Sequence, residues 1–393
     1  MEERKIKDLV SKELKVFWGD APANGISGDK LTSVIKTNNL SYEGKITYSS
    51  IALRNIDQSK IGDNYLNQGD LLIEKSGGTK THSVGYVNYF EGENQKYVAN
   101  NFILAIRPNP QLVLPKYLFY GIRHSYENGV YADCFNKTTG IQNLKKDAYL
   151  SKNISFRDTE EQKVIVSELD SIDFLITLKR KALENMNELV KSRFIEMFGH
   201  YFEDVRYFVK VGDIATATIG LTYKPDNVTD EGIIVLRSGN IQNAELCLSD
   251  DIVRVSNIRI KEDKFVREND ILMCSRNGSA RLVGKCCLIP KLNEQMSYGA
   301  FMTVIRSKYP YFLNGFFNST YFLQQLTGTQ TASVNQITTG MLNSYTVIKP
   351  SDTEENEFAE FVKLIDKSKF VVQQQIKDLQ ELLDKKMDEY FSE

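Results

Sequence analysis

The hydrophobic residues between positions 159 and 198 recur every three or four places, and no Pro or Gly interrupts them. A spacing that averages about 3.5 residues over four heptads is typical of a coiled coil. The pattern predicts one long helix, which either pairs with another helix or lies as an amphipathic helix on an ordinary core. The stripe consists of Ile165, Leu169, Ile172, Ile176, Lys179, Leu183, Met186, Val190, Arg193 and Met197.

The same stripe returns 193 positions later, near the end of the chain. We expect the two helices to pair antiparallel, each burying the stripe of the other. At 176/369 and 179/372 the stripe is polar in one copy only, which predicts exposed or partner-facing sites at Lys369 and Lys179. The second stripe consists of Phe358, Val362, Ile365, Lys369, Val372, Ile376, Leu379, Leu383, Lys386 and Tyr390. The predicted helix-pair interface is Ile165, Leu169, Ile172, Leu183, Met186, Val190, Val362, Ile365, Val372, Ile376, Leu379 and Leu383.

Ahead of each helix, short β-type runs separated by Gly and Asn predict a compact sheet. Each set of runs is followed by a helical stretch, a polar loop and a last strand, with the first helical stretch at 115–126, where Pro lies in the first turn. The two halves align directly at offsets of 199 to 200. The shared residues are Asp70/Asp270, Leu72/Leu272, Gly78/Gly278, Phe102/Phe301, Ile106/Ile305 and Arg107/Arg306.

The chain is therefore predicted to be a pseudo-twofold tandem repeat of a whole unit, a globular domain plus a long helix. The fold class is α+β, with two similar mixed α/β domains separated by two long antiparallel coiled-coil helices. The predicted boundaries are 1–158 for the first domain, 159–203 for the central helix, 204–352 for the second domain and 353–393 for the C-terminal helix.

Composition and charge indicate which classes of protein the chain can belong to. The net charge of −2 hides a split: +4 for residues 1–158, +3 for 204–350, −3 for 159–203 and −6 for 351–393. Two mildly basic domains beside acidic helices permit contact with phosphates through the domains alone. No apolar run approaches the roughly 20 residues of a membrane span, and the five cysteines form no CxxC pair. We expect a cytoplasmic protein with reduced cysteines, no metal and no membrane partner.

Catalytic motifs are missing from the sequence. It contains no Walker A pattern, no dinucleotide fingerprint, no HExxH and no nucleophile elbow. RPNP at 107–110 does not match the Asn/Asp-Pro-Pro-aromatic motif of amino-methylating DNA enzymes. His82, His124 and His200 stand far apart. No catalytic residue is predicted, and Trp18, the only tryptophan, is interpreted as a local core anchor.

Polar loops at matching places in the two halves carry the remaining chemistry. EKSGGTKTHS and SRNGSARLVGK each follow a strand and combine Gly with Lys or Arg and small hydroxyl residues. Such loops suit phosphates and guanine edges, although a solvated turn has the same composition. FNKTTGIQN and GTQTASVNQITTG are further polar loops depleted in acid. The candidate contacts are Lys75, Thr79, Lys80, Lys137, Arg276, Asn277, Ser279 and Arg281.

This order of motifs resembles the specificity (S) subunit of type I restriction-modification enzymes over nearly the whole chain. The resemblance is carried by TEEQKVIVSELDSID at Thr159, LENMNELVKSRFIEMFG at Leu183, VGDIATATIG at Val211, VLRSGNI at Val235 and DILMCSRNG at Asp270. The first domain lacks a clear copy of VGDIATATIG, and Trp18-Gly19-Asp20 is its only candidate remnant. The C-terminal helix has TEEN where the central helix has TEEQ.

The resemblance implies a non-catalytic, DNA-binding subunit of a heteromeric complex. Its two target recognition domains would each read one half of a split sequence in double-stranded DNA. Its helices would dock two methyltransferase (M) subunits, which bind S-adenosylmethionine; this chain itself would hold no cofactor. Restriction (R) subunits are further partners that the resemblance allows. About 35 helical residues span on the order of 50 Å, enough for two domains to reach grooves roughly 34 Å apart. Two alternatives stay open: a coiled-coil adaptor without DNA specificity, and a self-contained DNA methyltransferase or nuclease.

Overall fold

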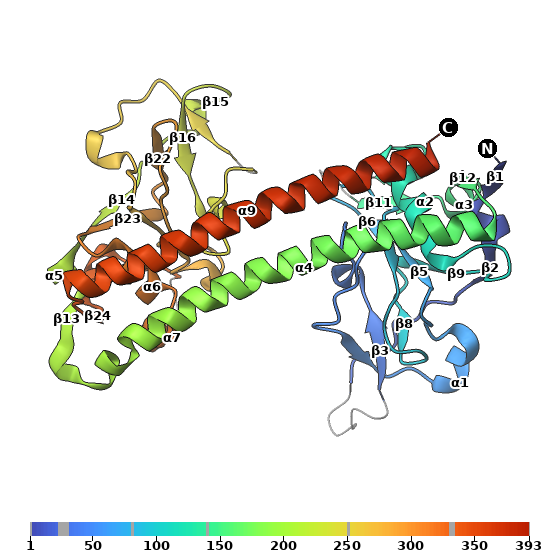
Figure 1. Ribbon diagram of the computed structural model, residues 1–393, viewed down its shortest axis with the longest axis horizontal. Coiled ribbons are helices and arrows are strands. Elements are labelled where there is room, and N and C mark those ends of the chain that lie inside the picture. The colour runs from blue at the N-terminus through green and yellow to red at the C-terminus, as the bar shows by residue number, and fades with distance from the viewer. Residues whose placement is uncertain are drawn as a thin grey trace. The chain divides into compact units, whose positions relative to one another are not determined.

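A computed structural model describes residues 2–22, 31–79, 82–138, 141–249, 252–329 and 335–392. The chain divides into two compact units (Figure 1). Unit 1 contains Met1–Leu178 and Gln375–Glu393, and unit 2 contains Lys179–Gln374. Each unit therefore consists of one mixed α/β domain together with a part of each long helix.

The domain of unit 1 is built on two small sheets. Its four-stranded sheet has the order β2-β9-β5-β7, with antiparallel pairs throughout, and a second sheet has the order β4-β3-β8, in which β3 and β8 are parallel. All four residues of β5 are buried, as expected for a strand covered on both faces. The elements are β1 (Glu2–Lys5), a 3-10 turn (Ile6–Leu9), β2 (Val10–Glu13), β3 (Thr32–Ile35), β4 (Ala52–Arg54), α1 (Gln58–Ile61), β5 (Leu71–Glu74), β6 (Ser76–Gly77), β7 (Val87–Tyr89), β8 (Tyr97–Ala99), β9 (Ile103–Pro108), α2 (Pro115–Glu127), β10 (Phe135–Thr138), β11 (Ile141–Leu144), α3 (Lys146–Leu150) and β12 (Asn153–Phe156).

The domain of unit 2 repeats this topology with one additional strand, β15, at the edge of its second sheet. Its sheets have the orders β14-β23-β20-β21 and β15-β19-β16-β22, and β16 and β22 form the parallel pair. The elements are β13 (Phe208–Lys210), α5 (Val211–Ile214), β14 (Ala215–Ile219), β15 (Val228–Thr229), β16 (Ile233–Leu236), β17 (Ile241–Gln242), β18 (Glu245–Leu246), β19 (Arg254–Val255), β20 (Ile271–Cys274), β21 (Cys286–Leu288), β22 (Met296–Tyr298), β23 (Met302–Ser307), α6 (Pro310–Phe317), α7 (Thr320–Thr329), α8 (Thr339–Ser344) and β24 (Thr346–Ile348).

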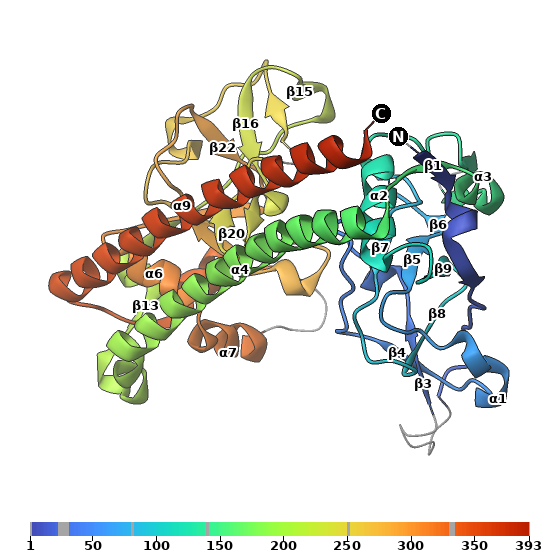
Figure 2. The ribbon, with the colours of Figure 1, turned by 45° about the vertical axis from the view of Figure 1, so that its right-hand side comes forward.

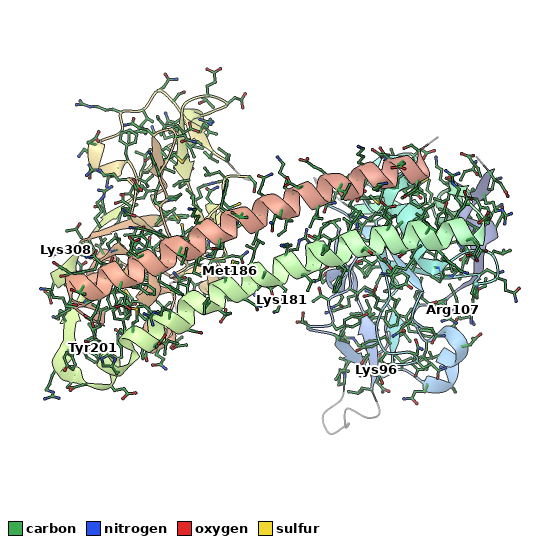
Figure 3. The ribbon with its side chains drawn as sticks, in the orientation of Figure 1. Lys96, Arg107, Lys181, Met186, Tyr201 and Lys308 are labelled. Atoms are coloured by element: carbon green, nitrogen blue, oxygen red, sulfur yellow. The ribbon has the colours of Figure 1, made fainter. Side chains whose placement is uncertain are left out.

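An ion pair between a buried aspartate and a half-buried arginine marks the same point in both domains. Arg107 and Asp70 lie 2.7 Å apart in unit 1, and Arg306 and Asp270 lie 2.9 Å apart in unit 2 (Arg107 is labelled in Figure 3). Each aspartate also accepts a backbone hydrogen bond in the turn before the central strand. The predicted internal repeat and fold class are confirmed, since strand order, the parallel pair and this ion pair recur.

The two long helices are α4 (Thr159–Phe198) and α9 (Asp352–Phe391). In unit 1, the start of α4 runs antiparallel to the end of α9: Lys386 lies 3.1 Å from Glu168, and the Tyr390 hydroxyl also donates to Glu168. In unit 2, Phe194 and Phe198 of α4 both pack against Phe358 of α9. Figure 2 shows each helix as one uninterrupted element.

The helix stripe packs on the domains as well as on the other helix. In unit 1, Ile165, Leu169, Ile172, Ile176 and Leu383 share a core with α2, and Ile376 and Leu379 border it. In unit 2, Val190 and Val362 border the core that contains Phe358. Leu183, Met186 and Val372 are half-buried, and Ile365 is buried. Near the helix ends, the stripe therefore pairs with the other long helix and also packs on a domain core, so both predicted interpretations hold there.

The prediction of an exposed site at Lys369 is wrong. Lys369 is buried, and its ammonium lies 2.9 Å from Glu245 of β18 and 3.4 Å from Asp366. A buried lysine requires such partners. The equivalent Ile176 is buried among apolar residues of unit 1, and Lys179 is half-buried.

The start of the first domain also differs from the prediction. Residues 2–13 form strand, 3-10 turn and strand, and β1 pairs with β12 just as β13 pairs with β24. Ile6–Leu9 therefore occupies the place of the VGDI segment, Val211–Ile214. The entry motif is IKDL, and Trp18-Gly19-Asp20 is not its remnant. Trp18 is no core anchor either, because its indole is exposed and lies 4.3 Å from the guanidinium of Arg54.

Candidate nucleic-acid interface

Two of the polar segments of unit 1 form one ribbon. Loop L1, the described residues 75–79 and 82–85, leaves the end of β5, and its β6 strand pairs with β11 of the β10–β11 hairpin. Ser76 Oγ donates to Asn143 Oδ1 at 2.6 Å across this pairing. Two loops that the sequence places about 60 residues apart therefore present a single polar edge.

Three of the four candidate residues of unit 1 lie on this ribbon. Lys75 is half-buried at the start of L1, and Thr79 is exposed, with its hydroxyl accepting from the His82 amide at 3.0 Å. β10 pairs Lys137 with Gln142, which pairs in turn with Gly77. The side chain of Lys137 and the whole of Lys80 lie outside the described residues.

The corresponding segments of unit 2 also meet. Loop L2, residues 276–285, leaves the end of β20, and Arg276 forms an isolated bridge with Gln336. The Asn335 amide group donates to the Gly278 carbonyl at 3.1 Å, and the Ile337 amide donates to the Ser275 carbonyl at 2.7 Å. L2 is thus held by the segment that corresponds to the β10–β11 hairpin of unit 1.

The four candidates of unit 2 divide by role. Arg276 and Arg281 are exposed, whereas Asn277 and Ser279 are half-buried. The Asn277 side chain accepts from the Ser279 amide at 2.9 Å and donates to Ser238 Oγ at 3.2 Å, so it shapes the loop. The two arginines are left as the side chains that face solvent.

Three cations of these loops are free of carboxylates. Within the described part of the chain, no Asp or Glu forms an ion pair with Lys75, Arg276 or Arg281. By contrast, the exposed Lys96 lies 2.7 Å from Glu93, and Lys308 lies 2.6 Å from Asp352 (both labelled in Figure 3). A cation without an internal partner is available to a phosphate or a base edge.

A buried carboxylate lies beneath L1. Glu74 ends β5, and the Gly78 amide approaches its Oε1 at 3.5 Å, while its Oε2 has no partner among the described residues. Burial raises the pKa of the Glu74 carboxyl. A Cβ at Gly77 would lie 2.5 Å from the same carboxylate, at a φ of +140°, so the loop requires glycine there. Unit 2 has Cys274 at the matching position, where burial raises the pKa of the thiol.

Sequence reasoning missed several residues of this surface. Tyr42 stacks on His82 beside L1, with ring centroids 3.8 Å apart. Phe102 and Phe301 are exposed next to L1 and L2. The identity of Phe102 and Phe301 in the repeat was visible in the sequence, but their exposure was not.

The long helices expose apolar side chains at equivalent places. Leu178 and Leu382 of unit 1 correspond to Val371 and Leu189 of unit 2, and all four are between 41% and 50% exposed. In unit 1, Leu382 borders a shallow groove of about 590 Å³, which is also lined by Lys163, Val164, Ser167, Glu168, Ser171 and Ile172.

Two other kinds of site were sought in the described residues. They contain no group of three or more His, Cys, Asp or Glu side chains placed to hold a metal ion. No helix among them combines the length and the hydropathy needed to cross a membrane.

Residues 29–188 match the family profile described as the type I restriction modification DNA specificity domain. Over this part of its length the chain is similar to type I specificity subunits. It is 24% identical over 202 residues to a protein assigned as the type I restriction enzyme MjaX specificity subunit of Methanocaldococcus jannaschii, covering 50% of this chain and 45% of that one. It is 26% identical over 158 residues to the type I restriction enzyme StySPI specificity subunit of Salmonella potsdam, covering 38% of this chain and 34% of that one. The match thus spans less than half the length of these specificity subunits.

The fold is shared with a solved chain from a study of complex assembly and conformational transition of the type I restriction-modification system. The TM-score is 0.51 at 15% identity, with 99% of this chain and 97% of the other covered. At this identity the likeness concerns the fold alone. The predicted resemblance to specificity subunits is confirmed by the family profile and the two relatives.

Proposed function

We propose that this chain is the DNA sequence-recognition subunit of a type I restriction-modification complex. The proposal rests on the equivalent positions of L1 and L2 in the two domains. Each loop is hydrogen-bonded to a second polar segment, and each has cations that form no ion pair with a carboxylate of the described residues. Cations contact phosphates and read guanine, while amide and hydroxyl groups pair with base edges. The two domains would each read one half of a bipartite target.

The differences between L1 and L2 support two different half-sites. L1 carries Lys75 and a Gly-Gly pair above the carboxylate of Glu74, whereas L2 carries Arg276 and Arg281 above the thiol of Cys274. Arginine forms a bidentate pair with guanine, which lysine does not match in geometry. We expect the two half-sites to differ in sequence although the frameworks agree.

We further propose that the long helices dock methyltransferase subunits. Leu178 and Leu382 in unit 1 and Val371 and Leu189 in unit 2 give each unit two exposed apolar side chains at equivalent helix positions. Equivalent exposed apolar residues in two units suit two copies of one partner. A restriction subunit would join through such an assembly.

The chain would contribute recognition and no chemistry. Its relatives are named as specificity subunits, and the sequence holds no motif for S-adenosylmethionine. The methyl donor would bind to the methyltransferase partner, and the double-stranded DNA would bind to both.

The proposal is tested by charge reversal within the assembled complex. Lys75→Glu and Arg276→Glu should each weaken binding of duplex DNA, while the methyltransferase subunit still copurifies with the chain. Lys96→Glu and Lys308→Glu are matched controls, because these exposed lysines already have carboxylate partners. Unchanged DNA binding by both loop variants would remove L1 and L2 from the interface. Assembly without any DNA binding by the wild type would favour an adaptor.

A further inference from the structure

An exposed phenylalanine occupies the same tight turn in both domains. The Ile103 amide donates to the Asn100 carbonyl at 3.1 Å, and the Met302 amide donates to the Gly299 carbonyl at 2.8 Å, which closes four-residue turns. Phe102 and Phe301 are the third residues of these turns and are 48% and 57% exposed. Neither phenylalanine has a positive φ, and a turn of this kind accepts most residues, so local structure does not call for phenylalanine.

The core does not need these rings either. Within the described residues, Phe102 and Phe301 belong to none of the apolar clusters of either domain. A single exposed apolar side chain is ordinary. The recurrence of the same exposed residue, in the same turn of two domains that differ most in their loops, points to a shared use.

Both turns are hydrogen-bonded to the candidate DNA-binding loops L1 and L2 or to the residue directly before them. The Phe102 carbonyl accepts from the Lys75 amide at 2.8 Å and from the Ser76 amide at 3.2 Å. The Phe301 carbonyl accepts from the Ser275 and Arg276 amides at 2.9 and 3.1 Å, and from Ser275 Oγ at 3.0 Å. Two or three donors on one carbonyl fix the backbone of each phenylalanine relative to its loop.

The charges beside the rings match a nucleic-acid surface. The guanidinium of Arg276 lies 5.2 Å from the centroid of the Phe301 ring. In unit 1 the contact is between backbone atoms, since the Lys75 amide donates to the Phe102 carbonyl. An aromatic ring next to uncommitted cations allows the cations to hold the phosphate backbone while the ring touches bases.

The geometry points to Phe102 and Phe301 as apolar base contacts, one for each half of the DNA target. Each ring would pack on a base, either against a thymine methyl group or partly inserted between two base pairs. The inference rests on the proposed DNA recognition and adds the residues that make the apolar contact.

The experiment uses the full chain assembled with its methyltransferase subunit, and a pool of random-sequence duplexes from which the complex selects its preferred DNA. Phe102→Ala and Phe301→Ala should each lower affinity for the selected duplex about tenfold, a typical effect of losing an aromatic contact to one base. Each variant should lose sequence preference in one half of the site only. Phe174→Ala and Phe370→Ala are matched controls, since these helix residues are also exposed, by 62% and 69%.

Salt dependence separates a base contact from a phosphate contact. Phe102→Ala and Phe301→Ala should leave the slope of log affinity against log salt unchanged, whereas Arg276→Ala should reduce it by about 0.9. Phe→Leu variants should recover part of the affinity, and thermal unfolding should stay unchanged because the rings are outside the cores. If the ring contacts a thymine methyl group, replacing thymine by uracil in the duplex should abolish the difference in affinity between wild type and the Ala variants. If the ring is inserted between base pairs, the fluorescence of 2-aminopurine placed in the duplex should rise on binding.

The outcomes are distinct. If the wild type selects DNA and both Ala variants select the same DNA and bind it equally well, the inference is overturned and the proposed function stands. Wild type that selects no duplex would overturn the proposed function and the inference with it.

Discussion

Glu355 provides a direct test of how α9 is joined to the domain of unit 2. Its buried carboxylate accepts from the Tyr311 and Phe312 amides at 3.0 and 2.9 Å and so caps the start of α6. Burial raises the pKa of the Glu355 carboxyl from 4.5 to about 7, although these two hydrogen bonds and Lys363 favour the charged form. The equivalent residue of unit 1 is Gln162, which accepts from the Leu114 amide and donates to the Arg157 carbonyl.

The sign of the pH effect follows from proton binding. Between pH 4.5 and about 7, the folded chain keeps the proton of Glu355 and the unfolded chain has lost it. The free energy of unfolding should therefore fall as pH rises through this window, by about 1.4 kcal/mol per unit and about 3 kcal/mol in all. Below pH 4.5 this contribution is fully present, and above about 7 it is lost.

The perturbation is an exchange between the two repeats. Glu355→Gln should remove this fall, because an amide does not titrate and can donate to the Pro350 carbonyl as Gln162 does to that of Arg157. Gln162→Glu should create the same fall in unit 1, since a carboxylate would face the Arg157 carbonyl. Urea unfolding at a series of pH values measures both: fluorescence of Trp18, the only tryptophan, reports on unit 1, and circular dichroism reports on the whole chain. Parallel curves of stability against pH for wild type and Glu355→Gln would refute the reasoning.

Three further substitutions test other contacts. Gly77→Ala should strain L1 by roughly 1–3 kcal/mol and weaken DNA binding. Gly278→Ala should do neither, because a Cβ at Gly278 meets open space and the φ there is ordinary. Equal DNA affinities for the two variants would contradict the idea that the shape of L1 above Glu74 matters for DNA binding. Asp270→Ala should destabilise unit 2 by about 1–3 kcal/mol in urea unfolding, since the half-buried Arg306 guanidinium and the Arg267 amide both lose the buried carboxylate that they share; an unchanged stability would speak against a structural role. Leu382→Asp should halve the amount of methyltransferase subunit that copurifies, with little change in melting, because the side chain is exposed and the docking residues of unit 2 are intact; an unchanged amount would place the docking surface elsewhere.

The repeat and the long helices were predictable because both depend on patterns within the sequence. Apolar spacing without Pro or Gly identified α4 and α9, and α2 spans Pro115–Glu127 where helix was predicted at 115–126. The constant offsets between the halves identified Arg107 and Asp70 as residues that recur in both domains, but did not show that the two form an ion pair.

The misses have a common physical cause, which is partners distant in sequence. Lys369 is buried because Glu245, 124 residues away, pairs with it. The entry segment Ile6–Leu9 was unrecognised because its strands are short, and their pairing with β12 and β9 is set by tertiary contacts. L1 and the β10–β11 hairpin were predicted separately, since only the fold brings Ser76 to Asn143.

The central claim, that this chain directs DNA modification to a sequence, is tested most directly by mapping methylated bases in the genome of the host. The account predicts a bipartite methylated motif that disappears when the gene for this chain is deleted. It also predicts that Arg276→Glu alters or erases one half of the motif and leaves the other half specified. A methylation map that is identical with and without the chain would contradict the account.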